Sequence, residues 1–495
     1  MTYDVAIIGS GIVGSCIARE LSKYKLQVCM IEKCDDVSCG TSKANSGIIH
    51  GGYDPVPGSL MAKLNVEGTA QYEKLSQQLH FEYKKTGSLV VGFSDEDMSH
   101  VQKLYDRGLK NGVPGMKILT EEELKEKEPS ISENAKGALF CESAGIVSPY
   151  QATWAFAENA VNNGVKLFLE TEVHAISAPE TRNGYWTIHT GQGEISSRVV
   201  VNAAGLYADK ISEMAGARNF VIKPRRGEYF LLDNKCSGLA NHTLFQTPDN
   251  LGKGVLVTPT VDGNILVGPS ADDNSDRENT ATTRSGQDLI MKKAEKTIPD
   301  IPRRNIINSF SGIRAIAYNP DGSPVNDFII EEDSVQKCFI NVAGICSPGL
   351  SAAPAIGRYV AELVENAMKK SGALDENKGF EKNPDFVAVR KGIESFKEAS
   401  DERKAQLIEE NALYGRIICR CEMITEAEIV QAINSPVGAR DLDGVKRRTR
   451  AGMGRCQSGF CSPRVTEIIS RERKIPMTSV TKCGGCSYIL NSKTR

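Results

Sequence analysis

The chain has 495 residues, 40% hydrophobic, 25% charged and 6% aromatic. This length and composition predict about two to four ordinary globular domains and exclude a wholly disordered chain or a fibrous repeat. Sixty Lys and Arg against sixty-two Asp and Glu give a net charge of −2, so no chain-wide basic excess points to nucleic acid or to an anionic membrane.

The amino-terminal residues run directly into an apolar segment, without a basic stretch or a cleavage site, which predicts a cytoplasmic protein with no targeting segment. The longest charge-free run, residues 338–357, matches a membrane span in length. Because it contains two prolines and three glycines, we interpret it as a buried, turn-rich segment and predict no integral membrane span.

The first forty residues follow a strand, turn, helix, strand pattern. Residues 5–8 (VAII) are typical of a buried parallel strand. The glycine-rich turn GSGIVG at 9–14 follows, then helical spacing at 15–21 and a second apolar strand at 27–31. In this context the glycine triplet predicts a dinucleotide-binding site.

Each polar or glycine position of this pattern has a physical role. Gly9 allows the tight turn, Gly11 lets the backbone approach a pyrophosphate, and Gly14 lets the helix pack closely on the strand. The N-terminus of the helix offers free N–H groups to the phosphates. Glu32, eighteen residues after Gly14, can accept the ribose hydroxyls of either FAD or NAD.

Three later segments decide between these cofactors. They are GTSKANSGIIHGGY at 40–53, VVVNAAGLYAD at 199–209 and NVAGICSPGLS at 341–351. In this order they resemble the FAD motifs of the D-amino-acid-oxidase-like flavoenzymes, in particular the FAD-dependent glycerol-3-phosphate dehydrogenases and oxidases and the L-2-hydroxyglutarate dehydrogenases. The chain departs from the family at Cys346, where an acidic residue is usual.

The resemblance implies an α/β fold in which residues 1–370 combine a Rossmann-like FAD-binding domain with an antiparallel-sheet substrate domain. The FAD-binding parts would be about 1–85, 145–215 and 325–370, and the substrate-binding parts about 86–144 and 216–324. The residues that the motifs place at FAD are Gly9, Gly11, Gly14, Glu32, Lys33, Thr41, Ser42, Asn45, Ser46, Val173, Ala204, Gly205, Gly349, Leu350 and Ser351.

Within the substrate domain, the apolar runs 230–232, 254–257 and 264–268 predict strands, and Asp262-Gly263 predicts a hairpin turn between the last two. Residues 371–412 are charged and favour helix, so we predict a helical linker there.

Oxidation of an alcohol by flavin needs a base for the hydroxyl proton and a fixed cation for an anionic substrate. His50 follows the second FAD motif, where the family places a histidine over the flavin, and imidazole titrates near neutrality. The resemblance also implies Lys253 near the substrate oxyanion, Arg314 as the group that grips a phosphate or carboxylate, and Ser347 as a hydrogen-bond donor to the same anion. The alternatives are a surface turn for Lys253 and a packing role for His50.

Six of the fourteen cysteines lie in the last 77 residues. Cys419, Cys421, Cys456 and Cys461 are candidates for the four thiolate ligands that a [2Fe–2S] cluster needs. Spacing alone leaves zinc open, although structural zinc sites usually separate their first two cysteines by two to four residues. The surrounding runs at 415–422 and 452–461 resemble the bacterioferritin-associated-ferredoxin-like [2Fe–2S] domain, which implies a small helical domain over residues 413–495.

Three further features of this region need interpretation. Residues 425–428 (TEAE) predict a capping box that opens a helix, and Ser462 with Pro463 predicts an N-cap followed by the first helical position. Residues 437–474 include ten basic and four acidic residues. These charges form either a solvated face or a positive field that stabilises the extra electron on a reduced cluster or steers an acidic partner. Cys483 and Cys486 form a C-x-x-C pair that is either inert or redox-active.

Together, the resemblance implies an enzyme: an FAD-dependent dehydrogenase of the anaerobic glycerol-3-phosphate type. A hydride would pass from sn-glycerol 3-phosphate to FAD, yielding dihydroxyacetone phosphate, and single electrons would leave through the cluster to a partner protein. One alternative keeps the fold but oxidises L-2-hydroxyglutarate, another 2-hydroxy acid or an amine. A second alternative is an electron-transfer subunit with no small-molecule substrate of its own.

Overall fold

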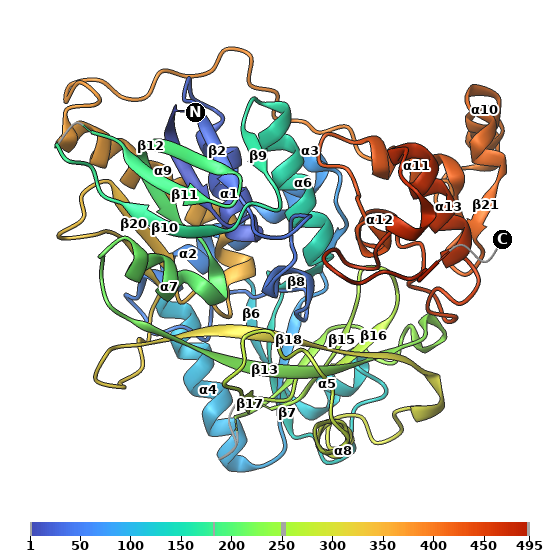
Figure 1. The fold of residues 1–495 in the computed structure, drawn as a ribbon. Helices are drawn as coiled ribbons and strands as arrows, with labels where there is room; N and C mark the ends of the chain where they lie inside the picture. Colours follow the sequence, from blue (N-terminus) through green and yellow to red (C-terminus); the bar gives the residue numbers. More distant parts are fainter. Residues whose placement is uncertain (1, 182–183, 249–253, 493–495) are drawn as a thin grey trace.

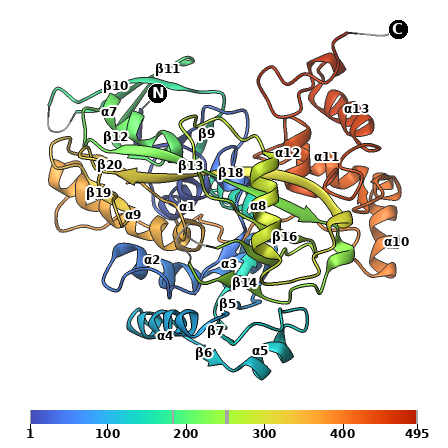
Figure 2. The same ribbon diagram turned by 90° about the horizontal axis from the view of Figure 1, so that it is seen from below.

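The computed structural model describes residues 2–181, 184–248 and 254–492. Figure 1 shows two sheet-based layers, one above the other, with a mostly helical C-terminal region beside both. Figure 2, seen from below, shows the same C-terminal region as a separate lobe. The predicted α/β class is confirmed.

The first sheet has a parallel centre. β1 pairs in parallel with β2 and β12, β2 with β9, and β12 with β20, while β10, β11 and β19 add antiparallel edges. The main path of the sheet, in spatial order, is β10 (Val173–Ser177), β11 (Trp186–Thr190), β12 (Gly193–Asn202), β1 (Thr2–Ile8), β2 (Val28–Ile31) and β9 (Lys166–Phe168). β20 (Phe339–Ala343) and β19 (Ile329–Glu332) extend it beyond β12.

Helices cover one face of this sheet. α1 (Ile12–Leu21) packs against both α6 (Pro149–Asn162) and α9 (Gly349–Ser371). Val5 and Ile7 of β1 join the core beneath these helices, while Ala6 and Ile8 join a second core on the other face, which α7 (Ala208–Met214) helps to cover. Burial on both faces is the reason why residues 5–8 are apolar without alternation.

The second sheet is antiparallel except for the parallel pair β14–β5. Its strands, in order, are β17 (Asp272–Asp273), β13 (Val221–Leu232), β16 (Ile265–Gly268), β15 (Leu256–Pro259), β14 (Thr243–Gln246), β5 (Ser88–Gly92), β7 (Gly137–Cys141) and β6 (Met116–Leu119), with β18 (Ile306–Tyr318) on β13. The predicted hairpin at Asp262-Gly263 is confirmed, since β15 pairs with β16 and Pro259 lies opposite Ile265.

Shorter elements complete these layers. α2 (Leu60–Thr69) packs against α9, and α3 (Tyr72–Leu79) packs against α6. Three helices pack against strands of the second sheet: α4 (Asp95–Lys110), α5 (Glu121–Lys127) and α8 (Arg284–Ala294). A small sheet pairs β3 (Ile48–Ile49) and β4 (Tyr83–Lys84) with β8 (Gly145–Val147).

The predicted helical linker is wrong over residues 372–400, which form an extended path along the first layer, and right only for α10 (Asp401–Glu410). Side-chain anchoring replaces helix formation in this segment. Arg390 is fully buried, donates to Glu158 Oε1 at 2.9 Å and to the Leu79 carbonyl at 2.7 Å, and lies over the Trp154 ring. Pro384 and three glycines also disfavour a helix here.

The C-terminal region has its own apolar core. Its elements are the paired strands β21 (Ile417–Cys419) and β22 (Ile424–Thr425) and the helices α11 (Glu426–Asn434), α12 (Leu442–Thr449) and α13 (Ser462–Arg473). The capping box formed by Thr425 and Glu428 is confirmed. The second predicted cap is wrong by one residue, because α13 begins at Ser462 and Cys461 is its N-cap.

The charge-free run 338–357 divides into β20, a turn and the first part of α9, as expected for a buried, turn-rich segment. Among the described residues, no helix combines the length and the apolar character that crossing a membrane requires.

Candidate active site and cluster site

A cavity of about 1040 Å³ lies at the carboxyl end of β1 and is lined by residues of both sheets. Gly9, directly after β1, has a φ of +105°, and a Cβ there would lie 2.5 Å from the Ala203 carbonyl oxygen. Only glycine fits this close approach between the turn and the end of β12. At Gly9 and Gly11 the backbone itself therefore lines the cavity, with no side chain in front of it.

Glu32 is fixed at the edge of this glycine wall. Its Oε2 accepts hydrogen bonds from the Ser10 N–H at 3.0 Å and the Ser10 hydroxyl at 2.9 Å, and its Oε1 accepts one from the Cys34 N–H at 3.1 Å. The Ser42 hydroxyl accepts a hydrogen bond from the Ile12 N–H, in the first turn of α1, at 2.9 Å. This arrangement places a carboxylate and a helix N-terminus at the two positions that a dinucleotide requires.

The predicted FAD residues line the cavity with two exceptions, Gly14 and Ser351. A Cβ on Gly14 would lie 2.0 Å from the Gly9 carbonyl oxygen, so this glycine allows helix packing behind the site. Ser351 accepts the His50 N–H at 2.7 Å and so holds the histidine backbone. The cavity size, the glycine wall and the fixed carboxylate fit FAD.

His50 lies in the same cavity and is held at several points. Its carbonyl oxygen accepts hydrogen bonds from Asn65 Nδ2 at 2.6 Å and from the Thr69 hydroxyl at 2.7 Å. Its ring lies 5.6 Å from the Phe245 ring, and the hydroxyl of Ser347, predicted as a donor to the substrate anion, lies 3.3 Å from His50 Nε2. The backbone and the ring of His50 are thus held at several points inside the cavity.

Arg314 extends from β18 into the cavity with free hydrogen-bonding capacity. Its Nε and Nη2 are buried and have no hydrogen-bond partner among the described residues, and the same holds for the hydroxyl of neighbouring Ser311. The glycine between them, Gly312, lets β18 touch the Ala44 carbonyl, since a Cβ there would lie 1.8 Å from that oxygen. A buried guanidinium without an acceptor is costly, so this position is suited to an anionic ligand.

Aromatic residues close the space beside Arg314. Tyr229 stacks on Phe310 at 4.9 Å, and its hydroxyl lies 3.0 Å from the Ser46 hydroxyl. Sequence reasoning missed Ser311, although it lies in the same SGIR run as Arg314. Lys253 lies outside the described residues, so its predicted position near the substrate has no structural account.

The C-terminal region also forms part of the cavity wall, which the sequence did not predict. The contributing residues are Asp443, Lys446, Arg447, Arg450, Met453 and Gln457. Arg450 donates to Glu422 at 2.9 Å and to Asp262, in the hairpin turn of the second sheet, at 2.6 Å. The basic run 446–450 therefore faces inward, toward the cavity and its neighbours, in contrast to a solvated face.

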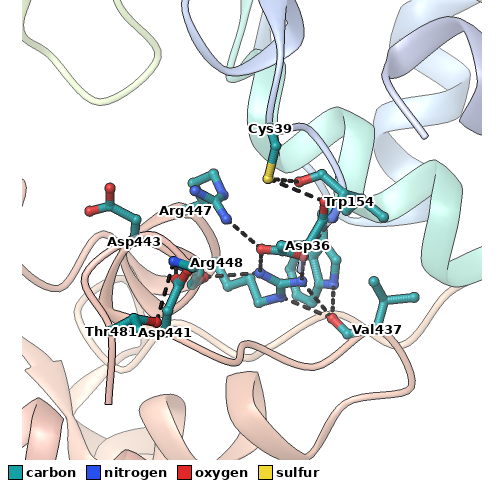
Figure 3. Close-up of polar contacts among 12 residues, drawn as sticks. Asp36, Cys39, Trp154, Val437, Asp441, Asp443, Arg447, Arg448 and Thr481 are labelled. Carbon is teal, nitrogen blue, oxygen red and sulfur yellow. Dashed lines mark hydrogen bonds and ion pairs between the residues drawn. The ribbon is translucent and has the colours of Figure 1, made fainter. Parts of the chain in front are cut away.

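Asp36 is the centre of the contact between the C-terminal region and the first layer (Figure 3). It is fully buried in the loop between β2 and the second predicted FAD motif at 40–53, and it binds Arg448 at 2.7 and 2.8 Å and Arg447 at 2.5 Å. Although burial alone would raise it, these guanidinium groups lower the pKa of Asp36 to about 2. Beside it, Trp154 Nε1 donates to the Val437 carbonyl at 3.1 Å.

Asp36→Asn is expected to lower the free energy of unfolding by about 3 kcal/mol, because it leaves two buried guanidinium groups without a charged acceptor. Urea unfolding followed by tryptophan fluorescence measures this, since Trp154, one of two tryptophans, lies at the contact. Glu170→Gln is the control: it removes an exposed ion pair with Arg440 across the same boundary and should change stability by less than about 0.5 kcal/mol. Equal effects of the two variants would contradict the central role of Asp36.

The four predicted cluster ligands converge from two segments of the C-terminal region. Cys421 Sγ lies 3.6 Å from Cys456 Sγ, and Cys419 pairs with Cys461. The hydrogen bond from the Cys461 thiol lowers the pKa of Cys419 to about 6, which favours the thiolate that binds iron. Gly454 allows this convergence, because a Cβ there would lie 2.3 Å from the Cys421 Cβ.

The donor set bears on the metal that the spacing left open. Four cysteine sulfurs are the donors that a [2Fe–2S] cluster requires, with the ligands shared between two irons. The all-sulfur donor set fits [2Fe–2S].

Cys483 and Cys486 are both exposed free thiols in a loop beyond α13. The loop packs on the first layer, because Gly484 lies against the Asp35 carboxylate. The two readings of this pair, inert and redox-active, both remain.

Comparison with known proteins gives two family matches. The model of the family "FAD dependent oxidoreductase" matches residues 4–363, and that of the "BFD-like [2Fe-2S] binding domain" matches residues 417–471. The second match supports the cluster interpretation of the four cysteines.

Three relatives illustrate the range of similarity. A glycerol 3-phosphate dehydrogenase of Caloramator mitchellensis is 48% identical over 493 residues, which is 100% of this chain and 99% of that protein. A mitochondrial L-2-hydroxyglutarate dehydrogenase of Bos taurus is 30% identical and covers 74% of this chain and 90% of its own length. The structure of dithionite-reduced L-alpha-glycerophosphate oxidase from Mycoplasma pneumoniae, with FAD bound, superposes with a TM-score of 0.72 at 32% identity and covers 79% of this chain and 98% of that one.

Proposed function

Because the chain belongs to the FAD dependent oxidoreductase family and carries a BFD-like [2Fe-2S] binding domain, we propose that it oxidises sn-glycerol 3-phosphate to dihydroxyacetone phosphate and passes the electrons singly to a partner protein. The observation that carries this proposal is Arg314, whose buried Nε and Nη2 have no acceptor among the described residues and which lines the same cavity as His50 and the dinucleotide-binding turn. The full-length similarity to a glycerol 3-phosphate dehydrogenase, cluster domain included, supports the choice of substrate.

Different residues of the chain have different roles in the proposed reaction. Arg314 binds the phosphate of the substrate through its planar fork, with the Ser311 hydroxyl as a second donor. His50 accepts the proton of the substrate hydroxyl, and Ser347 holds its Nε2 side in place. FAD, when bound, supplies the acceptor for the hydride. Lys253 is proposed to assist at the developing oxyanion.

The cluster domain gives the electrons a route out of the protein. A hydride carries two electrons, whereas a [2Fe–2S] centre takes one at a time, so a second centre suits an acceptor that accepts single electrons. We also propose a cytoplasmic location, since none of the fourteen cysteines, all of them described, forms a disulfide and clustered cysteines in a reducing compartment serve as ligands.

Anaerobic addition of sn-glycerol 3-phosphate to purified protein is expected to bleach the flavin absorbance within one turnover, whereas L-2-hydroxyglutarate leaves it unchanged. A planar guanidinium binds phosphate or carboxylate, so the substrate has to be tested directly. Bleaching by L-2-hydroxyglutarate alone would assign the chain to the 2-hydroxy acid alternative. Absence of bleaching by any small alcohol, 2-hydroxy acid or amine would favour the electron-transfer alternative.

A further inference from the structure

The loop that carries Cys456 and Cys461 also presents an unusual apolar side chain. Phe460 is 87% exposed, the highest value among the large apolar side chains that the structure describes. A single exposed apolar residue needs no explanation in general, but this one lies directly beside a predicted cluster ligand. Its position therefore links it to the cluster.

The surroundings of Phe460 are also accessible. Cys421 is exposed and Cys456 half-buried, and their sulfur atoms lie 3.6 Å apart, so two of the four ligands reach the surface at one place. The contact between Gly454 and Cys421 brings the two ligand loops together. Met423, on the first loop, is 43% exposed, and Pro463, after the second, is exposed as well. Exposed apolar side chains thus accompany the ligands in both loops.

Three arginines stand next to these residues in the sequence: Arg420 before Cys421, Arg455 before Cys456 and Arg464 after Pro463. All three are exposed. Arg455 contacts Asp233 at 3.2 Å and Arg464 contacts Glu467 at 2.9 Å, each by one nitrogen, so both guanidinium groups keep further donors toward solvent. Glu422, the acid next to Cys421, is instead buried against Arg450.

We propose that the cluster face, defined as Arg420, Met423, Arg455, Phe460, Pro463 and Arg464, is the docking surface for an acidic protein that carries one electron at a time. An apolar centre with Phe and a rim of Arg has the anatomy of a protein interface. The basic rim attracts a negatively charged partner and repels a basic one, while the exposed ligands keep the two redox centres close.

This inference rests on the electron-acceptor part of the proposed function and makes it specific. The partner gains one electron at each encounter and the enzyme loses one, so two partner molecules leave reduced for each substrate that gives up two electrons. Small, transient interfaces are typical of such electron transfer, and the six residues of the cluster face are a surface of that kind.

The test measures electron transfer in the opposite direction, from the partner to the enzyme, and therefore needs no substrate. Holoenzyme with oxidised centres is mixed in a stopped-flow instrument with a reduced plant-type [2Fe–2S] ferredoxin, an acidic one-electron protein, and the second-order rate constant of cluster reduction is measured. Phe460→Ala is expected to lower this constant about tenfold. Replacing Arg420, Arg455 and Arg464 by Gln should also lower it and should flatten its fall with increasing salt.

Matched controls separate docking from damage to the cluster. Val335→Ala removes a side chain that is 77% exposed, and Arg284→Gln removes an arginine whose side chain is 94% exposed, both outside the C-terminal region, and neither should change the constant. Reduction by dithionite, which needs no docking surface, and the iron content should stay unchanged in every variant.

A rate constant that is the same in Phe460→Ala and wild type would overturn the proposal, as would a rate that rises with salt. If Phe460→Ala instead halves the mass of the holoenzyme in solution, the face is a contact between two copies and the proposal fails. Failure of glycerol 3-phosphate to bleach the flavin, with the ferredoxin reaction intact, would contradict the proposed substrate and leave the docking surface supported.

Discussion

Arg314→Gln is expected to lower kcat/KM for sn-glycerol 3-phosphate about a thousandfold, because it removes a buried, charge-assisted pair of hydrogen bonds to the substrate phosphate. Glutamine keeps one amide NH2 donor group but is shorter and loses the charge. Since two nitrogens of Arg314 have no acceptor among the described residues, the variant should fold at least as well as wild type. The measurement is the rate of anaerobic flavin bleaching over a range of substrate concentrations.

Arg225→Gln is the matched control. Arg225 lies directly opposite Arg314 in the pairing of β13 with β18, but its side chain is 36% exposed and its Nε binds Asp273 at 2.7 Å. Its replacement should change kcat/KM by less than about threefold, since the guanidinium already has its acceptor. Equal losses in both variants would show that positive charge on the sheet, and not a specific phosphate contact, accounts for the effect.

The way in which the loss divides between kcat and KM gives further information. If Arg314 binds substrate and transition state alike, KM rises and kcat is preserved; if it also orients the hydroxyl toward His50, kcat falls as well. FAD content should stay at the wild-type level in either case. A variant that loses FAD would place Arg314 at the cofactor and contradict its assignment to the substrate.

The parts of the molecule that the sequence predicted well are those in which the signal is local. The turn after β1, the carboxylate at the end of β2 and the capping box of α11 each follow from residues within one or two elements. Their chemistry depends on backbone geometry that neighbouring residues fix, as the φ of +105° at Gly9 illustrates. The proposed cysteine ligands rest on an equally local signal, since the four thiols fall in two short runs of the sequence.

The parts that the sequence did not predict depend on contacts between distant segments. Asp36 and Arg448 are 412 residues apart, and neither has a neighbour that marks it as buried. The charged composition of 372–400 led to the prediction of a helix, but Pro384 and three glycines oppose one, and Arg390 is held by Glu158 and Trp154 in a tertiary contact that the sequence does not show. Ser311 shares a run with Arg314, yet only the structure shows that its hydroxyl lacks a partner in the cavity wall.

Cys456→Ser is expected to remove the [2Fe–2S] cluster while flavin bleaching by the substrate stays within about threefold of wild type. Serine keeps the size of the side chain but does not supply the thiolate on which iron binding depends. Cys456 belongs to the more exposed of the two thiol pairs and lies outside the apolar core of the domain, so the fold should survive its replacement. An anaerobic dithionite titration should then take up one electron fewer per chain than in wild type.

Iron analysis and electron paramagnetic resonance after addition of substrate provide the two readouts. In wild type, substrate electrons should give the signal of a reduced cluster; in Cys456→Ser that signal should be absent although the flavin still bleaches. Cys486→Ser is the control, since Cys486 is an exposed free thiol outside the cluster site, and it should keep both iron and signal. Full iron content in Cys456→Ser would reject the proposed ligand set. Loss of both the cluster and the bleaching would mean that substrate oxidation itself depends on the C-terminal domain. Arg450 of that domain lines the cavity and binds Asp262, so such a dependence has a physical basis, and the two separate readouts would reveal it.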